Sequence, residues 1–176
     1  MADAERSVSA RLSLREYQLA LSERLQSAQA GARVPSKLGL RVGGDAWLVD
    51  LSEAGEVIPV PPIAPVPLAQ PWFKGVANVR GNLYSVTDFS AFVGAKRAAI
   101  SDQARLLIIA ERFHVGAALL VERSLGLRNA DRLTPQPGAG AQPWVRAQYT
   151  DADGQVWREL DIAGLVQNEA FLEVSV

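Results

Sequence analysis

The chain carries the sequence PWFKGVANVRGNLYSVTDF at residues 71–89, and this segment gives its strongest structural signal. Two short runs rich in β-branched and aromatic residues flank Arg80-Gly81-Asn82. Gly81-Asn82 is a plausible tight-turn pair, because glycine and asparagine tolerate the positive φ angles that two-residue hairpin turns need. The pattern predicts a β-hairpin between Val76 and Phe89.

Several residues of this segment have interpretations that depend only on their chemistry. Gly75 and Gly81 suit positions of positive φ or of close backbone approach. Asn78 can hydrogen-bond its own chain across a turn, and Trp72 can fill a gap in a core. Arg80 differs, since an arginine followed by glycine at a strand end can present its two-donor guanidinium to a carboxylate on a partner protein. An internal salt bridge is the alternative for Arg80.

Working upstream, residues 37–51 predict a second hairpin. The apolar residues Leu38, Leu40 and Val42 alternate with others and predict the first strand. Gly43-Gly44-Asp45 supplies the turn, and Ala46 to Leu51 predicts the returning strand. Six prolines follow, at positions 59, 61, 62, 65, 67 and 71, and exclude a helix or a central strand there. We expect an extended connection, since interleaved apolar residues are typical of a packed edge. A polyproline ligand for an SH3-like partner is the less favoured alternative.

Downstream, the pattern continues as short strands. Residues 92–104 predict a polar connector with room for a short helix, and Leu106 to Ala110 and Val115 to Val121 predict a pair of strands. Residues 134–143 form a loop rich in Pro and Gly, residues 148–157 turn through Asp151-Ala152-Asp153-Gly154, and residues 159–171 predict a short helix. Many short strands at intervals of about 8–12 residues, framed by terminal helices, favour an all-β architecture of the barrel type.

The N-terminal segment predicts one amphipathic helix. Ser13 and Glu16 form a capping box, and apolar residues then recur at roughly heptad spacing until Gly31 and Pro35 end the pattern; they are Leu14, Tyr17, Leu21, Leu25 and Ala28. This helix either packs on its own domain or serves as an arm that docks on a partner. We expect an N-terminal segment at residues 1–36 and one domain at residues 37–176.

Composition excludes several classes of function. The chain has 176 residues, one histidine and no cysteine, so it has no disulfides and no thiolate metal site, and a reducing cytoplasm is the simplest location. The 18 basic and 19 acidic residues are interspersed, with a net charge of −1, which makes nucleic acid an unexpected partner. No apolar run reaches the roughly 18 residues that predict a membrane-spanning helix, so we expect no membrane insertion.

Signals for catalysis and metal binding are weak. Asp151-Ala152-Asp153-Gly154 lacks the twelve-position calcium-loop pattern and predicts a solvated turn. His114 has no catalytic motif around it, and the chain has neither a phosphate-binding loop nor a nucleophile elbow. We therefore predict no catalytic residue, no metal ligand and no cofactor. An enzyme built on carboxylates brought together by the fold is the alternative.

Residues 71–89 resemble the signature of the CheW family of chemosensory coupling proteins: an aromatic residue, then Gly-Val, Asn, Arg-Gly and an alternating strand. Further stretches follow the family's order, namely Glu56-Val57, Leu120-Val121-Glu122, and Leu160-Asp161 with Leu165. The resemblance covers residues 37–166. It implies a fold of two five-stranded SH3-like β-barrels packed together, to which the N-terminal amphipathic helix is appended.

The resemblance also implies a function. Such a protein is a non-catalytic scaffold that bridges the cytoplasmic tip of a chemoreceptor and the regulatory domain of a histidine kinase, with an apolar groove between the barrels for the receptor helix and barrel ends for the kinase. The expected location is the cytoplasm, with recruitment to receptor arrays at the membrane. A regulatory adaptor that binds a response regulator outside any array is the alternative.

Residues of the chain can be matched to this function one by one. The expected partner-binding residues are Arg80, Glu56, Val57, Asn78, Gly75, Trp72 and Leu106. The Arg of Asn-x-Arg-Gly, here Arg80, lies in the resembling family where coupling protein, receptor and kinase meet. Ala54, Glu122 and Ser124 depart from the family pattern. Residues 71–82 and the N-terminal helix are most similar to the branch that serves type IV pilus twitching motility.

Overall fold

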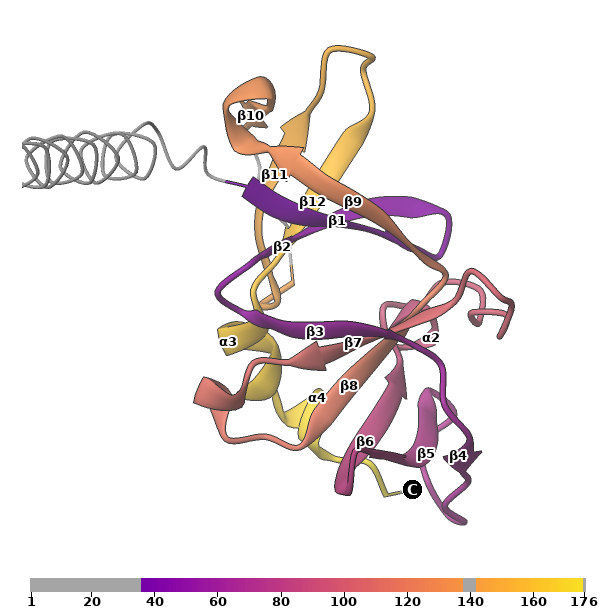
Figure 1. Ribbon diagram of the computed structural model, residues 1–176. Coiled ribbons are helices and arrows are strands. Elements are labelled where there is room, and N and C mark those ends of the chain that lie inside the picture. The colour runs from indigo at the N-terminus through magenta and orange to yellow at the C-terminus, as the bar shows by residue number, and fades with distance from the viewer. Residues whose placement is uncertain (1–35, 138–141, 176) are drawn as a thin grey trace, which may run out of the picture. The chain divides into compact units, whose positions relative to one another are not determined.

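The computed structural model describes residues 36–137 and 142–175, and strands form two six-stranded sheets in this part of the chain (Figure 1). Sheet 1 has the strand order β10-β11-β12-β2-β1-β9, and sheet 2 has the order β3-β7-β8-β6-β5-β4. The strands are β1 (Ser36–Val42), β2 (Asp45–Asp50), β3 (Ala54–Pro59), β4 (Ile63–Ala64), β5 (Phe73–Val79), β6 (Asn82–Asp88), β7 (Arg105–Ile109), β8 (Ala117–Val121), β9 (Arg123–Asn129), β10 (Thr134–Gln136), β11 (Val145–Thr150) and β12 (Val156–Leu160). The helices are α2 (Phe89–Phe92), α3 (Ile162–Val166) and α4 (Glu169–Leu172), with the 3-10 helices η1 (Glu111–Phe113) and η2 (Ala130–Arg132).

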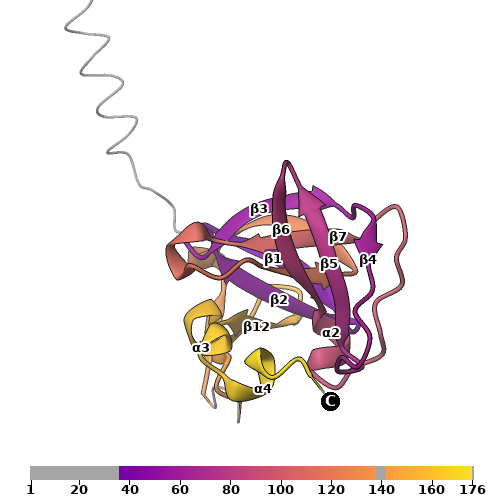
Figure 2. The same ribbon diagram turned by 90° about the horizontal axis from the view of Figure 1, so that it is seen from below.

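The chain passes twice between the sheets. It builds β1 and β2 in sheet 1, crosses to sheet 2 for β3 to β8, and returns to sheet 1 for β9 to β12. Two pairings are parallel, β6 with β8 and β12 with β2, whereas the hairpins are antiparallel. The C-terminal segment with α3 and α4 then runs back alongside sheet 2, where Ser175 pairs with Ala69 (Figures 1 and 2).

Strands β2, β7 and β8 each alternate between two cores, which explains their continuous apolar sequences. Leu107 and Ile109 of β7 enter the main core, which also contains Trp47, Val49 and Leu160 of sheet 1. The intervening residues of β7, Leu106 and Ile108, face a second core inside sheet 2. Strands β8 and β2 alternate in the same way, the latter into a third core inside sheet 1. Because the main core joins both sheets, they pack as one body.

The predicted all-β class and the three predicted strand pairs are confirmed. Strands β1 and β2 pair with Leu40 opposite Trp47, β5 pairs with β6, and β7 pairs with β8. Gly43 and Gly44 adopt φ angles of 60° and 85° in the first hairpin turn, as its residue types indicated. Each sheet has six strands where five were expected, because the edges carry β4, of two residues, and β10, of three.

Other details differ from prediction. The hairpin turn consists of Arg80-Gly81, one residue earlier than Gly81-Asn82, because Val79 pairs with Asn82. The predicted helix at residues 159–171 is two short helices, α3 and α4, separated at Asn168. Leu160 belongs to β12, because α3 begins only after its N-cap residue, Asp161. Strand β9 was not expected, and β10 occupies the first three residues of the predicted loop 134–143 because they pair with β11. The predicted N-terminal amphipathic helix lies outside the described residues, and the boundary at residue 36 stays a prediction. No helix in the described part of the chain is long and apolar enough to span a bilayer.

Candidate functional site

The β5–β6 turn presents Arg80 at the end of sheet 2. Arg80 and Gly81 have φ angles of 52° and 89°, the left-handed values of a two-residue hairpin turn. The Asn78 side chain accepts a hydrogen bond from the Gly81 N–H at 2.8 Å, which is the local role that its residue type indicated. A non-glycine residue in this conformation is strained by about 1–2 kcal/mol, so the fold holds Arg80 in place against a cost.

The guanidinium of Arg80 forms a two-pronged salt bridge with Glu56. Nη1 donates to Oε2 at 2.9 Å and Nη2 donates to Oε1 at 2.7 Å. The Arg80 side chain is 73% exposed and that of Glu56 is 45% exposed. The internal salt bridge considered for Arg80 is therefore present, and both charged groups remain open to solvent and to a partner.

Strand β3 places Glu56 outward and Val57 inward. Val57 is half-buried against the main core, and so is Ala54 at the start of the strand. The pairing of β3 with β7 shifts register between Ala54 and Val57, and Gly55 lies close against the backbone oxygens of Ile108 and Ile109. Of the predicted pair Glu56-Val57, only Glu56 has its side chain on the open surface.

Trp72 and Gly75 lie away from the hairpin turn, just before β5 and near its start. Trp72 is half-buried, stacks on Phe171 at 6.3 Å between ring centroids and meets Phe92 edge-on at 5.2 Å. Gly75 is buried with φ of 128°, and a Cβ there would lie 2.0 Å from the Ala64 oxygen. The structure thus brings Arg80, Glu56 and Asn78 together, whereas Trp72 lies at the opposite end of the hairpin, where its carbonyl accepts from the Asp88 N–H, and Gly75 lies against β4.

Leu106 occupies a different position from the other predicted contact residues. Its side chain is fully buried, with 0% exposure, in the core inside sheet 2. It pairs with Leu120 of β8 on one side and with Ile58 of β3 on the other. Leu106 therefore supports the sheet that carries Glu56 and has no surface to offer a partner in this structure.

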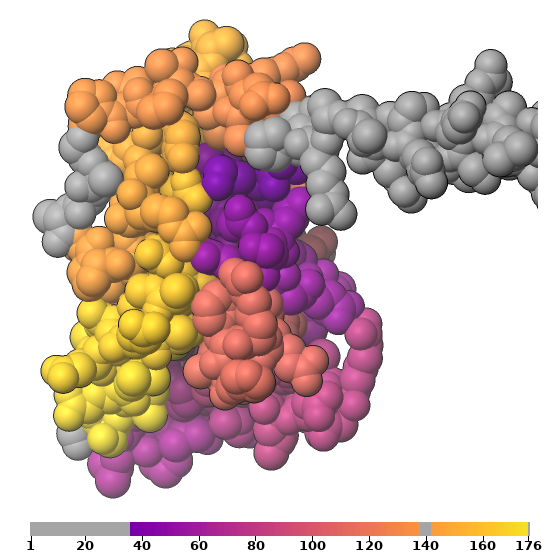
Figure 3. All heavy atoms as spheres, turned by 90° about the vertical axis from the view of Figure 1, so that its left-hand side faces the viewer, coloured from indigo at the N-terminus to yellow at the C-terminus, as the bar shows by residue number. Residues whose placement is uncertain are grey.

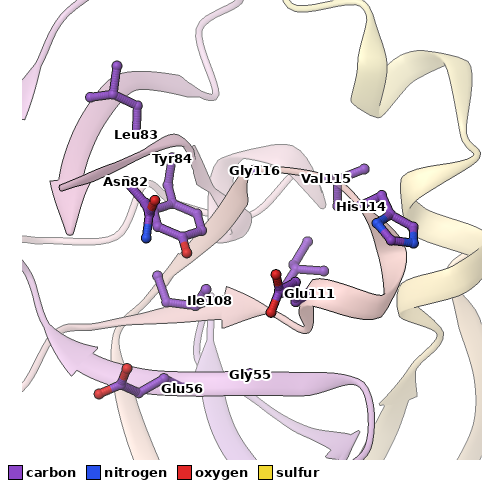
Figure 4. Close-up of a pocket in the computed structure, with 11 residues that line it drawn as sticks. Gly55, Glu56, Asn82, Leu83, Tyr84, Ile108, Glu111, His114, Val115 and Gly116 are labelled. Atoms are coloured by element: carbon purple, nitrogen blue, oxygen red, sulfur yellow. The ribbon is translucent and has the colours of Figure 1, made fainter. Parts of the chain in front are cut away.

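A pocket of about 660 Å³ opens where β6 begins and β7 ends (Figure 4). Asn82 and Tyr84 of β6 lie across from Glu56, and His114 lies at the far end. The other lining residues are Gly55, Leu83, Ile108, Ile109, Glu111, Val115 and Gly116. The segment around η1 projects from the surface beside the C-terminal helices (Figure 3). Leu83 is 68% exposed, so the pocket has an apolar edge next to its charged rim.

Sequence reasoning missed most of this pocket. The sequence predicted Asn82 as a turn residue and Leu83 and Tyr84 as strand, and it gave His114 no role. His114 is exposed and ends η1 with φ of 52°. The available signal was Leu83, an apolar residue in a strand whose alternation should have placed it outward. Among the described residues, no group of three or more His, Asp or Glu side chains is arranged to hold a metal ion.

A partly buried charge cluster lies apart from this pocket and joins the crossover to sheet 1. Arg146 donates to Glu53 at 2.5 Å and to Asp161 at 2.8 Å, and Glu53 also accepts from the Ile162 N–H at 3.3 Å. Burial alone would lower the pKa of Arg146, but the hydrogen bonds to Glu53 and Asp161 outweigh it and hold that pKa above its ordinary value. The cluster fixes the position of β3 relative to sheet 1.

Comparisons with known proteins agree with this architecture. Residues 37–170 match the CheW-like domain family, and the chain therefore belongs to that family. It is 30% identical to the protein PilI of Pseudomonas aeruginosa over 162 residues, which is 89% of each chain. The crystal structure of the scaffolding protein TtCheW from Thermoanaerobacter tengcongensis has the same fold, with a TM-score of 0.62 at 17% identity over 72% of this chain and 88% of that one.

Proposed function

We propose that this protein is a non-catalytic adaptor that couples the cytoplasmic tip of a chemoreceptor to the regulatory domain of a histidine kinase. The chemosensory system to which it belongs would control type IV pilus twitching motility. The protein itself would act in the cytoplasm, at receptor arrays. Membership of the CheW-like family and the similarity to PilI support this proposal. The observation that carries it is the exposed salt bridge between Arg80 and Glu56, of which Glu56 lines the sheet 2 pocket.

The pocket has the features of a protein-binding surface. The exposed Leu83 and the half-buried Tyr84 line it together with Glu56, the residue that holds the guanidinium of Arg80. Aromatic and arginine side chains are enriched where proteins bind most tightly. Arg80 can leave Glu56 for a carboxylate of the partner, or bind both carboxylates, since neither charged side chain of the pair is buried. In this proposal the pocket end of sheet 2 contacts the kinase domain.

The fold suits mechanical coupling. The main core takes side chains from both sheets, so force applied to one face is carried by close-packed elements. Coupling requires that the binding of one partner changes the free energy with which the scaffold binds the other. No covalent step is needed. A scaffold with separate binding faces meets that requirement when a change of state in one partner alters the contacts that the second partner makes.

The direct test is a binding experiment with both expected partners. The full chain is titrated with an isolated kinase regulatory domain and with a receptor-tip coiled coil, first separately and then together. The proposal predicts that each binds and that the three form one complex. Binding to a response regulator, with no affinity for either expected partner, would instead support an adaptor outside an array and overturn the proposal.

A further inference from the structure

A second pocket, of about 520 Å³, shares no lining residue with the first and is strongly basic. Arg41 comes from the end of β1, Arg123 from the start of β9, and Lys96 and Arg97 from the loop after α2, which projects to the right in Figure 1. Among the described residues that line it, Glu122 is the only acidic one. The local charge thus contrasts with the chain's net charge of −1.

Two of these cations are held side by side by the backbone. Arg41 and Arg123 lie directly opposite each other in the antiparallel pairing of β1 with β9. Like charges at such positions repel and destabilise a sheet. The guanidinium of Arg41 donates a hydrogen bond to the Gly44 carbonyl at 2.8 Å. Because that acceptor carries no net charge, the bond does not offset the repulsion between the two arginines.

The one acidic residue does not neutralise the group. Glu122 accepts a hydrogen bond from the Gly44 N–H at 3.2 Å, on the β1–β2 turn. In residues 36–137 and 142–175, no salt bridge of 4.0 Å or less contains Arg41, Lys96, Arg97 or Arg123. The pocket therefore lacks the anions that would balance its charge.

We propose that this basic pocket, defined by Arg41, Lys96, Arg97 and Arg123, docks an acidic segment of a protein partner. Guanidinium groups bind carboxylates through paired hydrogen bonds, and a bound carboxylate offsets the repulsion between Arg41 and Arg123. Ile100, which is 61% exposed between lining residues Ala99 and Ser101, offers an adjoining apolar contact. A segment that alternates acidic and apolar side chains fits both features better than a free phosphate or nucleic acid. This site does not depend on the function proposed above.

The test uses the full chain and a fluorescent synthetic peptide rich in Glu with interspersed Leu. The site variant carries Arg41→Gln and Arg123→Gln, and Arg132→Gln is the matched control, since Arg132 is exposed and lies outside the pocket. We expect the site variant to lose at least tenfold in peptide affinity and the control to keep it. A second variant, Lys96→Gln with Arg97→Gln, changes only a loop and should also weaken binding.

Stability and competition complete the test. Because the two arginines repel each other, the site variant should melt at the same temperature as the unmodified protein or higher, which a structural role for the pair does not predict. A peptide in which Gln replaces every Glu should not bind. Equal peptide affinity for the unmodified protein and both pocket variants would overturn the proposal, and so would inorganic phosphate that displaces the peptide at matched ionic strength.

Discussion

Arg80 and Glu56 join two elements of sheet 2 that are not neighbours in its hydrogen-bonded order. Arg80 lies in the β5–β6 turn, whereas Glu56 lies on β3, which is an edge strand separated from β6 by β7 and β8. Their two hydrogen bonds, of 2.9 and 2.7 Å, therefore cross the end of the sheet. The pair is exposed, so its contribution to folding and its contribution to binding can be separated by mutation.

Loss of the Arg80 side chain should cost little stability. An exposed pair contributes about 0.2–1 kcal/mol, so Arg80→Ala should lower the free energy of unfolding by about 1 kcal/mol or less. Urea unfolding measures this change. Arg80→Gly is the matched control, because glycine relieves the strain of φ at 52° and should be more stable than the alanine variant. A loss above about 3 kcal/mol would show that the pair is mainly structural.

Gly75 and Gly81 should respond very differently to alanine. Both have positive φ, but a Cβ at Gly75 meets the Ala64 oxygen at 2.0 Å, whereas a Cβ at Gly81 has no atom within 4 Å. Gly81→Ala should cost only the backbone strain, about 1–2 kcal/mol. Gly75→Ala should cost more than about 3 kcal/mol, or prevent folding, because β4 must move away from β5. Thermal melting compares them, and equal losses would contradict the close approach seen at Gly75.

The partly buried charge cluster should contribute more to stability than an exposed pair. Glu53 is 5% exposed and accepts from Arg146 and from the Ile162 N–H at the start of α3. Glu53→Ala should cost about 1–3 kcal/mol, because it leaves the buried Ile162 N–H without a partner. Asp45→Ala is the control, because it removes an exposed pair with Arg158 and should cost about 1 kcal/mol or less. Chemical unfolding of the two variants gives the comparison. Similar losses of unfolding free energy in both variants would contradict a larger contribution from the buried Glu53.

Tyr149 should make stability depend on alkaline pH. Burial, and then its hydrogen bond to Glu159 at 2.8 Å, raise the pKa of Tyr149 to about 12 from an ordinary value of 10.0. Between these values the unfolded chain loses the phenolic proton and the folded chain keeps it. The contribution of Tyr149 is therefore fully present below pH 10 and is lost as the pH rises towards 12. Stability of Tyr149→Phe should fall less steeply across that range, and identical pH profiles would refute the assignment.

The features predicted from sequence are those with local causes. Hairpins follow from alternation and from turn glycines such as Gly43 and Gly44, and the class of fold follows from their number. Strand β9 escaped notice because it is an edge strand with a register shift opposite Gly39 and Leu40 and has mostly exposed side chains. The parallel pairings of β6 with β8 and of β12 with β2 join distant segments, and no local pattern marks them.

The candidate site was predictable residue by residue but not as an arrangement. Arg80 and Glu56 were both singled out, yet their contact spans 24 positions and depends on how sheet 2 curves. Leu106 looked like its neighbours in the sequence, and only the second core inside sheet 2 explains why its side chain is inaccessible. The role of the site residues in partner binding stays a prediction.

The affinity of the Arg80→Ala variant for the kinase regulatory domain, measured together with its melting temperature, tests the proposed role of Arg80 most directly. We expect a melting temperature within about 4 °C of the unmodified protein. We also expect a loss of affinity from roughly tenfold to over a hundredfold, since a charge-assisted pair contributes about 1.5–3 kcal/mol. Arg80→Lys should restore affinity only in part, because an ammonium lacks the planar two-donor fork. Unchanged affinity in a well-folded Arg80→Ala protein would contradict the account.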